Sequence, residues 1–341
     1  SIGSPTQILE KYDYSTIIRM IVTVKKVVPP SMPVHLFGAG HPMFIPFAVA
    51  LGIDTFDSAS YILYAKDERL IFSHGTMRLK ELLDIPCSCP ICSKFTPKEL
   101  MQMTKNERVK YLAIHNLYTI IQEIKRVKQA IKENTLWDLL EERSRCHPSL
   151  LKAFKEIIKY KDYLEKYHPT IKAEVHGIFL YDILSMNRPE VLRHHRKILN
   201  NYKPPFYKGK SIVFLDLEEK PLTRTSVYIK LRENLEKRKL EDIHVLSFMP
   251  YFGIVPEELS ETYPLSQHEK DLDDKVLENS LNIFVKYFDK NRRTYSKVIL
   301  VVRDTNVDLA YRVHEKLHQL IKQVIILTYK NNVLELSLIH I

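Results

Sequence analysis

Cysteine is scarce in this sequence of 341 residues: the chain holds four, and none follows Cys146. Such a small number excludes the dense disulfide framework of small secreted domains and fits a reducing compartment. No apolar run reaches the roughly 20 residues that a membrane-spanning helix needs, no signal peptide opens the chain, and we find no internal repeat. These absences predict a soluble, cytoplasmic protein.

Acidic residues are outnumbered by basic ones: 41 Asp and Glu stand against 51 Lys and Arg, a net charge of +10. This excess favours a polyanionic partner such as nucleic acid. A lysine-rich surface adapted to heat has the same composition, so charge alone leaves both interpretations open. The length allows two or three domains, and a hydrophobic fraction of 45% supports a sizeable core.

The chain does not begin with methionine but with Ser1-Ile2-Gly3-Ser4-Pro5. This stretch has the composition of a loop that leaves a strand. We therefore expect that a segment precedes it, and that the chain is a fragment or one half of a split protein.

Three of the four cysteines lie close together, in Pro86-Cys87-Ser88-Cys89-Pro90-Ile91-Cys92. Three thiolates in one proline-stiffened turn, with an imidazole from a following helix, form the tetrahedral donor set of structural zinc. His115 is the expected fourth ligand; His147, which follows a helix break, is the rival. A reduced cysteine cluster without metal is the alternative, since disulfides between cysteines two apart are strained.

The N-terminal half alternates short apolar strands, at 34–37 and 53–56, with helices at 7–28 and 42–51. This order predicts an α/β fold with a parallel sheet covered by helices. In such folds chemistry lies at the carboxyl ends of the strands, where Asp57 stands. Further on, we expect a helix capped by Thr96 and Glu99, and a long helix from Asn106 to about Leu140 that includes His115.

The second half shows a further α/β alternation, with strands at 212–215, 244–248, 298–302 and 324–327 and helices between them. Tyr202-Lys203-Pro204-Pro205 is typical of a linker. We predict a first domain at 1–169, a linker at 170–205 and an accessory domain at 206–341.

Three segments together resemble one known family: Phe56-Asp57-Ser58-Ala59-Ser60, the cysteine turn, and His115-Asn116-Leu117. They resemble the tRNA-guanine transglycosylases, and His35-Leu36-Phe37-Gly38-Ala39-Gly40-His41-Pro42 is closest to the archaeal form. The resemblance runs from Ser1 to about Lys166. It implies a (β/α)8 barrel with an inserted zinc subdomain, of which this chain holds the last part. It also implies exchange of guanine 15 in the tRNA D-arm for 7-cyano-7-deazaguanine, a step towards archaeosine.

The same resemblance implies Asp57 as the nucleophile that attacks C1′ of the guanosine, as a carboxylate can. Its alternative role is a cap at a strand–helix turn, and we assign the nearby Asp54 a structural role. Gly3 and Ser4 match the loop that approaches the base.

Phe37 matches a position that stacks near the base, with core packing as its alternative. Lys66 and Arg69 match a segment that binds tRNA phosphates, with a solvated loop as their alternative.

The family's other essential aspartate would lie upstream of Ser1. Without the first strands a barrel cannot close, so we expect this chain alone to be inactive. The partners implied are tRNA, 7-cyano-7-deazaguanine, and the missing half or a homodimer partner. The alternatives are a non-catalytic tRNA-binding paralogue, an archaeosine synthase-like protein and a zinc-stabilised structural protein. The absence of cysteine after Cys146 argues against the synthase.

Overall fold

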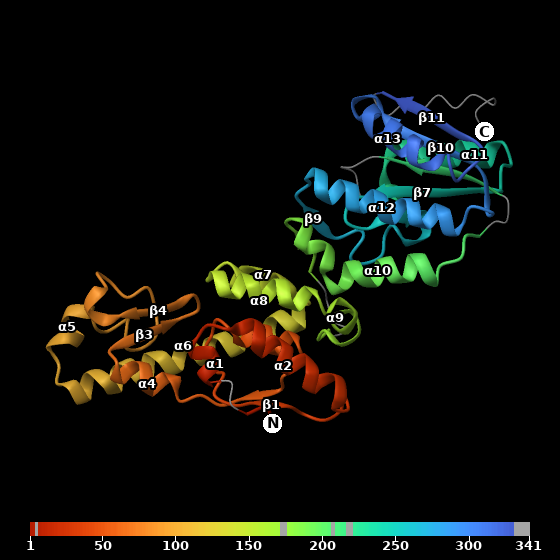
Figure 1. Cartoon of the computed structure of the whole chain (residues 1–341). Helices are drawn as coiled ribbons and strands as arrows, with labels where there is room; N and C mark the ends of the chain where they lie inside the picture. Colours follow the sequence, from red (N-terminus) through yellow and green to blue (C-terminus); the bar gives the residue numbers. More distant parts are fainter. Residues whose placement is uncertain (4–5, 171–175, 206–208, 216–220, 331–341) are drawn as a thin grey trace. The chain divides into compact units, whose positions relative to one another are not determined.

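The computed structural model describes residues 1–3, 6–170, 176–205, 209–215 and 221–330 (Figure 1). The chain divides into two compact units, Ser1–His176 and Gly177–Ile341. Both are mixtures of helices and strands, as the α/β prediction requires. Within the described ranges, no helix combines the length and apolarity needed to cross a bilayer.

The first unit contains the following elements: α1 (Thr6–Glu10), α2 (Tyr14–Val27), β1 (His35–Leu36), α3 (Ile45–Ala50), β2 (Thr55–Phe56), α4 (Ser60–Lys66), β3 (Arg69–Phe72), β4 (Gly75–Arg78), η1 (Leu79–Glu81), α5 (Pro97–Gln102), α6 (Lys105–Glu133), α7 (Leu136–Ser144), α8 (Pro148–Ile158) and α9 (Lys161–Tyr167).

The N-terminal part of this unit contains three parallel segments: β1, β2 and the short segment at Ile2. β1 pairs with β2, and Ile2 forms a parallel bridge to Leu36 on the other side of β1. Leu36 is fully buried, whereas its neighbours His35 and Phe37 are partly exposed. Because side chains alternate between the faces of a strand, one face is packed and the other is open. Among the described residues these short strands close no barrel.

The segment from 61 to 72 leads from the end of β2 into a β-hairpin. It forms α4 and then β3, which pairs antiparallel with β4. The hairpin packs on α6 and shares a hydrophobic core with the cysteine turn.

Helix α6 is the longest element of the first unit. It and α5 begin with complete capping boxes, at Thr104–Glu107 and Thr96–Glu99, which satisfy backbone amides at the start of each helix. The cap predicted at Thr96 is confirmed. The helix expected to reach about Leu140 ends earlier, because Asn134 adopts a left-handed conformation (φ 59°) and α7 starts two residues later.

The second unit contains the following elements: β5 (Ile178–Leu180), η2 (Ile183–Asn187), α10 (Pro189–Asn200), β6 (Gly209–Phe214), η3 (Leu222–Arg224), α11 (Ser226–Lys237), β7 (Ile243–Met249), β8 (Gly253–Pro256), η4 (Glu257–Leu259), β9 (His268–Lys270), α12 (Asp274–Lys290), β10 (Tyr295–Arg303), η5 (Asp304–Asn306), α13 (Val307–Leu317) and β11 (Val324–Tyr329).

A five-stranded sheet of order β11-β10-β6-β7-β8 forms the centre of this unit, with only β8 antiparallel. Alternate residues of each strand enter two separate cores. One core packs against α12 and α13 and the other against α11, so both faces are covered (Figure 1). This explains why the strands are continuously apolar.

The predicted linker at 170–205 differs from the observed structure. Residues 178–200 form β5, η2 and α10, and β5 pairs in parallel with β9. The apolar residues Ile178, Leu180 and Val191 are buried in the core of the second unit. The proline and polar residues at 202–205 lie after these elements, so their linker-like composition marks a loop inside the second unit.

Candidate active site and metal centre

The open face of the parallel strands carries four side chains from the predicted site region. In the β1–β2 register, His35 lies opposite Thr55, and Leu36 lies opposite Phe56. Asp57 follows β2 by one residue and Phe37 follows β1 by one residue. Because the side-chain period of a strand is two, His35 and Phe37 share a face with Thr55 and Asp57. The loops after β1 and β2 therefore meet at the carboxyl ends of the strands.

Asp57 is held at this edge by two hydrogen bonds to one carboxylate oxygen. Its Oδ1 accepts from the Gly38 amide at 2.8 Å and contacts Nε2 of His35 at 3.1 Å. The Gly38 amide, and to a lesser degree His35, lower the pKa of the Asp57 carboxyl, while partial desolvation opposes them. The side chain is 53% exposed. Asp57 is therefore an accessible carboxylate that is ionised at neutral pH.

His35, Gly38 and Thr55 were not predicted from the sequence as partners of Asp57. His35 also bonds through Nδ1 to Thr55 Oγ1 at 2.8 Å. Predicting these contacts would have required the register of the strands, since residues 35 and 57 become neighbours only when β1 and β2 pair in parallel.

The other predicted base-binding residues have different surroundings. Gly3 is exposed next to the Ile2 bridge, and Ser4 lies outside the described residues. Phe37 is 48% exposed and meets the His35 ring edge-on, with ring centroids 4.7 Å apart. It is therefore available for stacking. Asp54 accepts from the Val34 amide at 2.7 Å, a contact that ties the start of β2 to the start of β1.

The two residues predicted to bind phosphate lie at the end of α4 and at the start of β3. Lys66 is exposed at the end of this helix. Arg69 begins β3, where Nε and Nη2 donate to Thr76 Oγ1 at 3.0 and 2.8 Å. The guanidinium of Arg69 is therefore partly engaged within the hairpin.

A close approach at Gly40 links the loop after β1 to the loop that carries Asp57. A Cβ atom at Gly40 would lie 2.4 Å from Ser58 Cβ. We expect Gly40→Ala to lower the free energy of unfolding by about 1–3 kcal/mol, because the loops must separate. Chemical denaturation monitored by circular dichroism tests this expectation. The matched control is Gly3→Ala, where no atom lies within 4 Å; equal effects of the two variants would contradict it.

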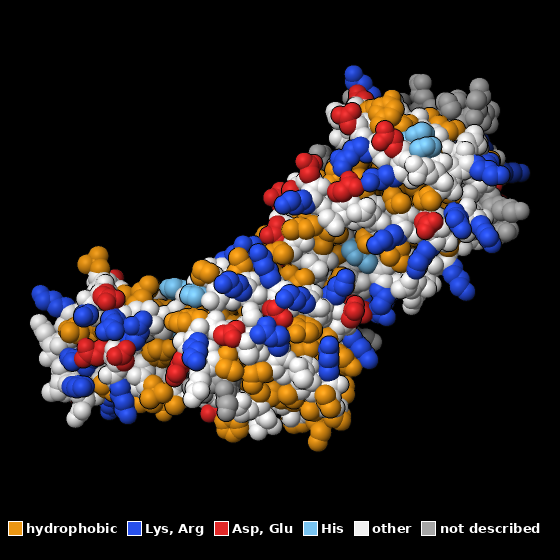
Figure 2. Space-filling model, viewed as in Figure 1, with side chains coloured by type: hydrophobic (Ala, Val, Ile, Leu, Met, Phe, Trp, Pro, Cys, Tyr) orange, Lys and Arg blue, Asp and Glu red, His pale blue; other side chains and the backbone are white. Residues whose placement is uncertain are grey.

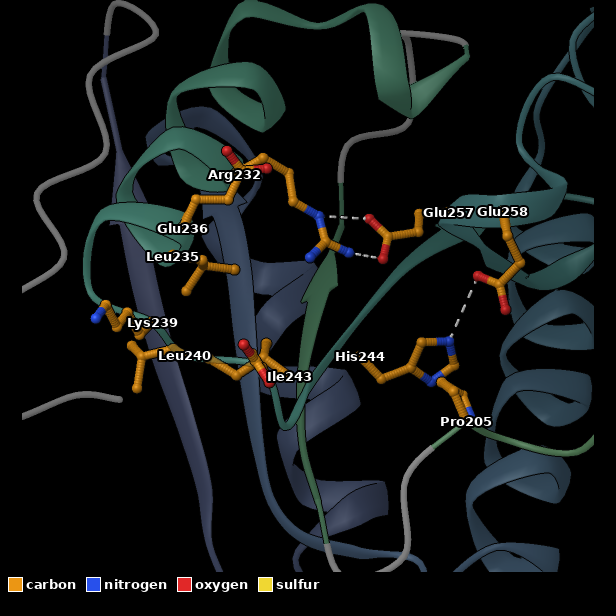
Figure 3. Close-up of a pocket in the computed structure, with 11 residues that line it drawn as sticks. Pro205, Arg232, Leu235, Glu236, Lys239, Leu240, Ile243, His244, Glu257 and Glu258 are labelled. Atoms are coloured by element: carbon orange, nitrogen blue, oxygen red, sulfur yellow. Dashed lines mark hydrogen bonds and ion pairs between the residues drawn. The ribbon is translucent and has the colours of Figure 1, made fainter.

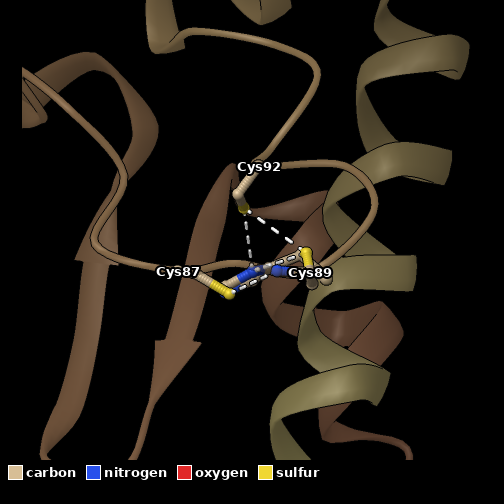
Figure 4. Close-up of side chains that lie close together, drawn as sticks. Cys87, Cys89 and Cys92 are labelled. Atoms are coloured by element: carbon tan, nitrogen blue, oxygen red, sulfur yellow. Dashed lines mark hydrogen bonds between the residues drawn. The ribbon is translucent and has the colours of Figure 1, made fainter.

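The cysteine turn and α6 bring four metal-ligating side chains together. One ligand atom each from Cys87, Cys89, Cys92 and His115 lies within 4.8 Å of the others. Figure 4 shows the three cysteine side chains close together on the turn. Cys89 Sγ is 3.5 Å from Cys92 Sγ, and His115 Nδ1 is 3.2 Å from Cys92 Sγ. Tetrahedral ligands of zinc are separated by roughly 3.5–3.8 Å, given Zn–S bonds of about 2.3 Å. The group can therefore hold a metal ion.

The tautomer of His115 suits this role. Its Nε2 lies 3.0 Å from the Ile71 carbonyl oxygen, an acceptor, so Nε2 carries the proton and Nδ1 presents its lone pair to the cysteines. Burial lowers the pKa of His115, which keeps the imidazole neutral. Burial raises the pKa of the Cys87 and Cys92 thiols, and a bound divalent cation favours their thiolate form.

His147, the rival ligand, does not belong to this cluster. Its Nδ1 accepts from the Ser149 amide at 3.1 Å and so caps α8. Its ring stacks on Tyr12 with centroids 4.8 Å apart. A structural role replaces the metal-binding alternative.

Asn116 connects the metal centre to the hairpin. Its Oδ1 accepts from the Ile71 amide at 2.7 Å, while Nδ2 donates to the carbonyl oxygens of Tyr61 and Arg69. Asn116 is fully buried. His115 bonds to the carbonyl oxygen of Ile71, and Asn116 bonds to the amide of the same residue. Together these two side chains hold α4 and β3 against α6.

Two cavities in the described part of the chain lie away from Asp57, and the first of them borders the cysteine turn. One, of about 920 Å³, runs from the cysteine turn along α6, and its single lining carboxylate, Glu123, is paired with Arg143 at 2.8 Å. The other, of about 560 Å³, lies in the second unit (Figure 3). There Arg232 pairs with Glu257. In each cavity these charged side chains are therefore engaged in a pair within the protein.

In the second cavity the side chain of Glu258 reaches His244, whose Nδ1 bonds to Tyr295 at 2.7 Å (Figure 3). Tyr202 Oη lies 3.0 Å from His244 Nε2 and also donates to Glu258. His244 is buried, so this network fastens the loop after α10 to the start of β7.

Comparison with known families finds a similarity in the first unit. The family model described as "Queuine tRNA-ribosyltransferase" matches residues 1–149, which include the Asp57 edge and the whole cysteine–histidine cluster. The match is thus a similarity of this part of the chain to that family.

Individual relatives extend the similarity into the second unit. The chain is 44% identical over 305 residues to the tRNA-guanine(15) transglycosylase of Saccharolobus solfataricus, covering 88% of this chain and 59% of that protein. It is 40% identical to the Sulfolobus acidocaldarius protein of the same name (88% and 58% covered), and 44% identical to that of Methanocaldococcus jannaschii (79% and 39% covered). The chain thus spans about half the length of the curated relatives it matches.

Proposed function

We propose that this chain contributes the nucleophile strand and zinc subdomain of a tRNA-guanine transglycosylase, which exchanges guanine 15 of tRNA for 7-cyano-7-deazaguanine in the cytoplasm. The observation that carries the proposal is Asp57, an accessible, hydrogen-bonded carboxylate at the carboxyl end of a parallel strand. It stands within the residues that match the family. The archaeal relatives' names supply the tRNA position.

The proposed reaction is a double displacement. A carboxylate oxygen of Asp57 forms a bond to C1′ of the guanosine while the C1′–N9 bond breaks, and guanine leaves with the bonding electron pair and takes up a proton from water. The incoming base later returns a proton to water. N9 of 7-cyano-7-deazaguanine, after losing its proton, then attacks C1′ and displaces the carboxylate. Each step exchanges one bond to C1′ for another, so no oxidant or reductant is needed.

We propose that residues 1–169, in the first unit, form the last part of a (β/α)8 barrel, and that the second unit, Gly177–Ile341, is an accessory domain. The open face that carries Phe37 and Asp57 supports this, because a barrel encloses such a face in its interior. Further strands, in the same polypeptide, in a second one or beside a second copy, would have to cover it. On this proposal the chain alone does not exchange guanine.

The metal we propose for the cluster is zinc, held by Cys87, Cys89, Cys92 and His115. Three thiolates and one imidazole leave no open coordination position, which is typical of a structural rather than a catalytic site. Its contribution is to hold the cysteine turn against α6 and, through Ile71, to position the hairpin after the nucleophile.

The proposed substrate is tRNA, with Gly3, Ser4 and Phe37 near the base and Lys66 and Arg69 near phosphates. The net charge of +10 favours a polyanion, and Figure 2 shows Lys and Arg side chains distributed over the visible face among Asp and Glu.

Binding of tRNA should therefore depend strongly on salt. We expect the affinity of the full chain for tRNA to fall by at least about 100-fold between roughly 50 and 200 mM salt, because bound cations are released from phosphates. Filter binding measures it. Lys66→Ala should reduce the slope of log affinity against log salt by about one, whereas Lys237→Ala on α11 serves as the matched control. A salt-independent affinity would contradict a phosphate-based interface.

The deciding experiment is base exchange in a completed barrel. The chain is fused to, or co-expressed with, the N-terminal half of the Saccharolobus solfataricus relative, and incorporation of labelled guanine or 7-cyano-7-deazaguanine into tRNA is followed. We expect incorporation with the completed protein and none with this chain alone. Binding of tRNA without exchange by a folded, completed protein would instead favour a non-catalytic paralogue.

A further inference from the structure

The contacts of Asp57 are asymmetric, and this asymmetry distinguishes its two oxygens. Both the Gly38 amide and His35 Nε2 bind Oδ1, at 2.8 and 3.1 Å, and Oδ2 receives neither bond. Two donors from β1 and its following loop thus fix the plane of the carboxylate. A carboxylate held in this way presents one oxygen in a constant direction.

His35 is itself oriented by a third residue. Its Nδ1 lies 2.8 Å from Thr55 Oγ1, its partner across the β1–β2 register. An ionised carboxylate only accepts hydrogen bonds, so Nε2 carries the proton that faces Asp57. In the neutral ring Nδ1 then accepts from the Thr55 hydroxyl. Thr55, His35 and Asp57 therefore form a hydrogen-bonded series across two parallel strands.

We propose, building on the function proposed above, that His35 is a positioning residue for the nucleophile: with the Gly38 amide it holds Oδ1 of Asp57, so that Oδ2 is the atom that attacks C1′. In the covalent intermediate Oδ2 becomes the ester oxygen bonded to C1′, and Oδ1 becomes the ester carbonyl. When the incoming base displaces the carboxylate, negative charge returns to it. The donors on Oδ1 stabilise that charge, so His35 serves both steps.

The surroundings of Asp57 make this assignment testable by pH. Within the described residues, His35 is the only charged or titratable side chain that contacts Asp57; the other groups that favour its ionised form are the backbone amides of Gly38 and of Asp57 itself. Loss of His35 should raise the pKa of Asp57, because a group that favours its ionised form is removed. The acidic limb of the rate profile, where Asp57 becomes protonated, should then move to higher pH.

The first experiment measures single-turnover formation of the protein–tRNA adduct by the completed barrel, with saturating tRNA. We expect His35→Phe to slow adduct formation by about 10- to 100-fold, with unchanged tRNA affinity and an acidic limb moved to higher pH. His35→Gln keeps an N–H donor and should recover part of the rate. His318→Phe, on the exposed end of α13, is the matched control and should behave as the wild type.

A merely structural role for His35 would lower the rate and tRNA affinity together without moving the acidic limb. That result, or a wild-type rate and profile for His35→Phe, would overturn the proposal. Equal losses in His35→Gln and His35→Phe would also overturn it, because the donor would then be irrelevant.

A second experiment separates this proposal from the proposed function. The Asp57 carboxyl carbon of the full 341-residue chain is followed by carbon NMR during a pH titration. We expect its pKa to lie below the ordinary value in the wild type and to rise in His35→Phe, whether or not any exchange occurs. If the completed barrel forms no adduct, the proposed function fails. An unchanged Asp57 pKa in His35→Phe shows instead that His35 does not hold the carboxylate.

Discussion

Replacing Asp57 by asparagine should reduce guanine exchange in the completed barrel by at least roughly 10⁴-fold, because the amide keeps the shape of the side chain but lacks the nucleophilic charge. The carbonyl oxygen of the new side-chain amide can still accept a hydrogen bond from the Gly38 amide, so the loop should keep its conformation and tRNA should still bind. The assay combines labelled guanine incorporation with a denaturing gel, on which the covalent protein–tRNA adduct should be absent from the variant.

Asp54→Asn is the matched control, since it changes the same residue type three positions earlier. Asp54 accepts from the Val34 amide at 2.7 Å and does not contact Asp57 in the described structure. We expect a loss of about 1 kcal/mol in stability and exchange close to that of the wild type. Wild-type exchange by Asp57→Asn, or a comparable loss in Asp54→Asn, would remove Asp57 from the role of nucleophile.

The sequence predicted the features that depend on local spacing. The close-set cysteines and the helical His115 were enough to anticipate the group that lies within 4.8 Å. The Thr96 cap was readable because Pro97 and Glu99 follow it in the order that a capping box requires. Such signals involve residues only a few positions apart, or one ligand on a strongly periodic helix.

The features that depend on pairing between distant segments could not be predicted from the sequence. His35 approaches Asp57 only because β1 and β2 adopt one parallel register, and strands of two residues carry no periodic signal for that register. Asn116 was visible as part of a motif, but its three backbone partners belong to α4 and β3.

The predicted linker at 170–205 differs from the observed division of the chain at residue 176 for a related reason. The prolines near residue 204 suggested a linker, yet the preceding apolar residues Ile178 and Val191 belong to the second core. β5 is short and pairs with β9, about 90 residues later in the chain. A strand whose partner is so distant is recognisable only after the sheet has formed.

Loss of the metal should have the largest effect on stability. We expect Cys89→Ser to abolish tight binding of one zinc equivalent and to destabilise the hairpin and cysteine turn by several kcal/mol, since the binding energy of a structural zinc is folding energy. Metal content by mass spectrometry of the purified chain measures the first effect and thermal denaturation the second. Cys146→Ser is the matched control, because Cys146 lies outside the cluster, and it should retain a full equivalent.

Loss of the metal should destabilise the structure locally, and β3 should be affected because His115 contacts it. The ring of His115 donates to the Ile71 carbonyl, and the Ile71 amide donates to Asn116, so removal of the metal frees the ring and weakens the attachment of β3 to α6. Hydrogen exchange of the Ile71 amide should therefore accelerate by at least about 100-fold in Cys89→Ser or after chelation. The amide of Leu246, in the central sheet of the second unit, should exchange at an unchanged rate. Equal acceleration at both amides would indicate global unfolding, and protection at Ile71 without metal would show that the hydrophobic core alone holds the hairpin in place.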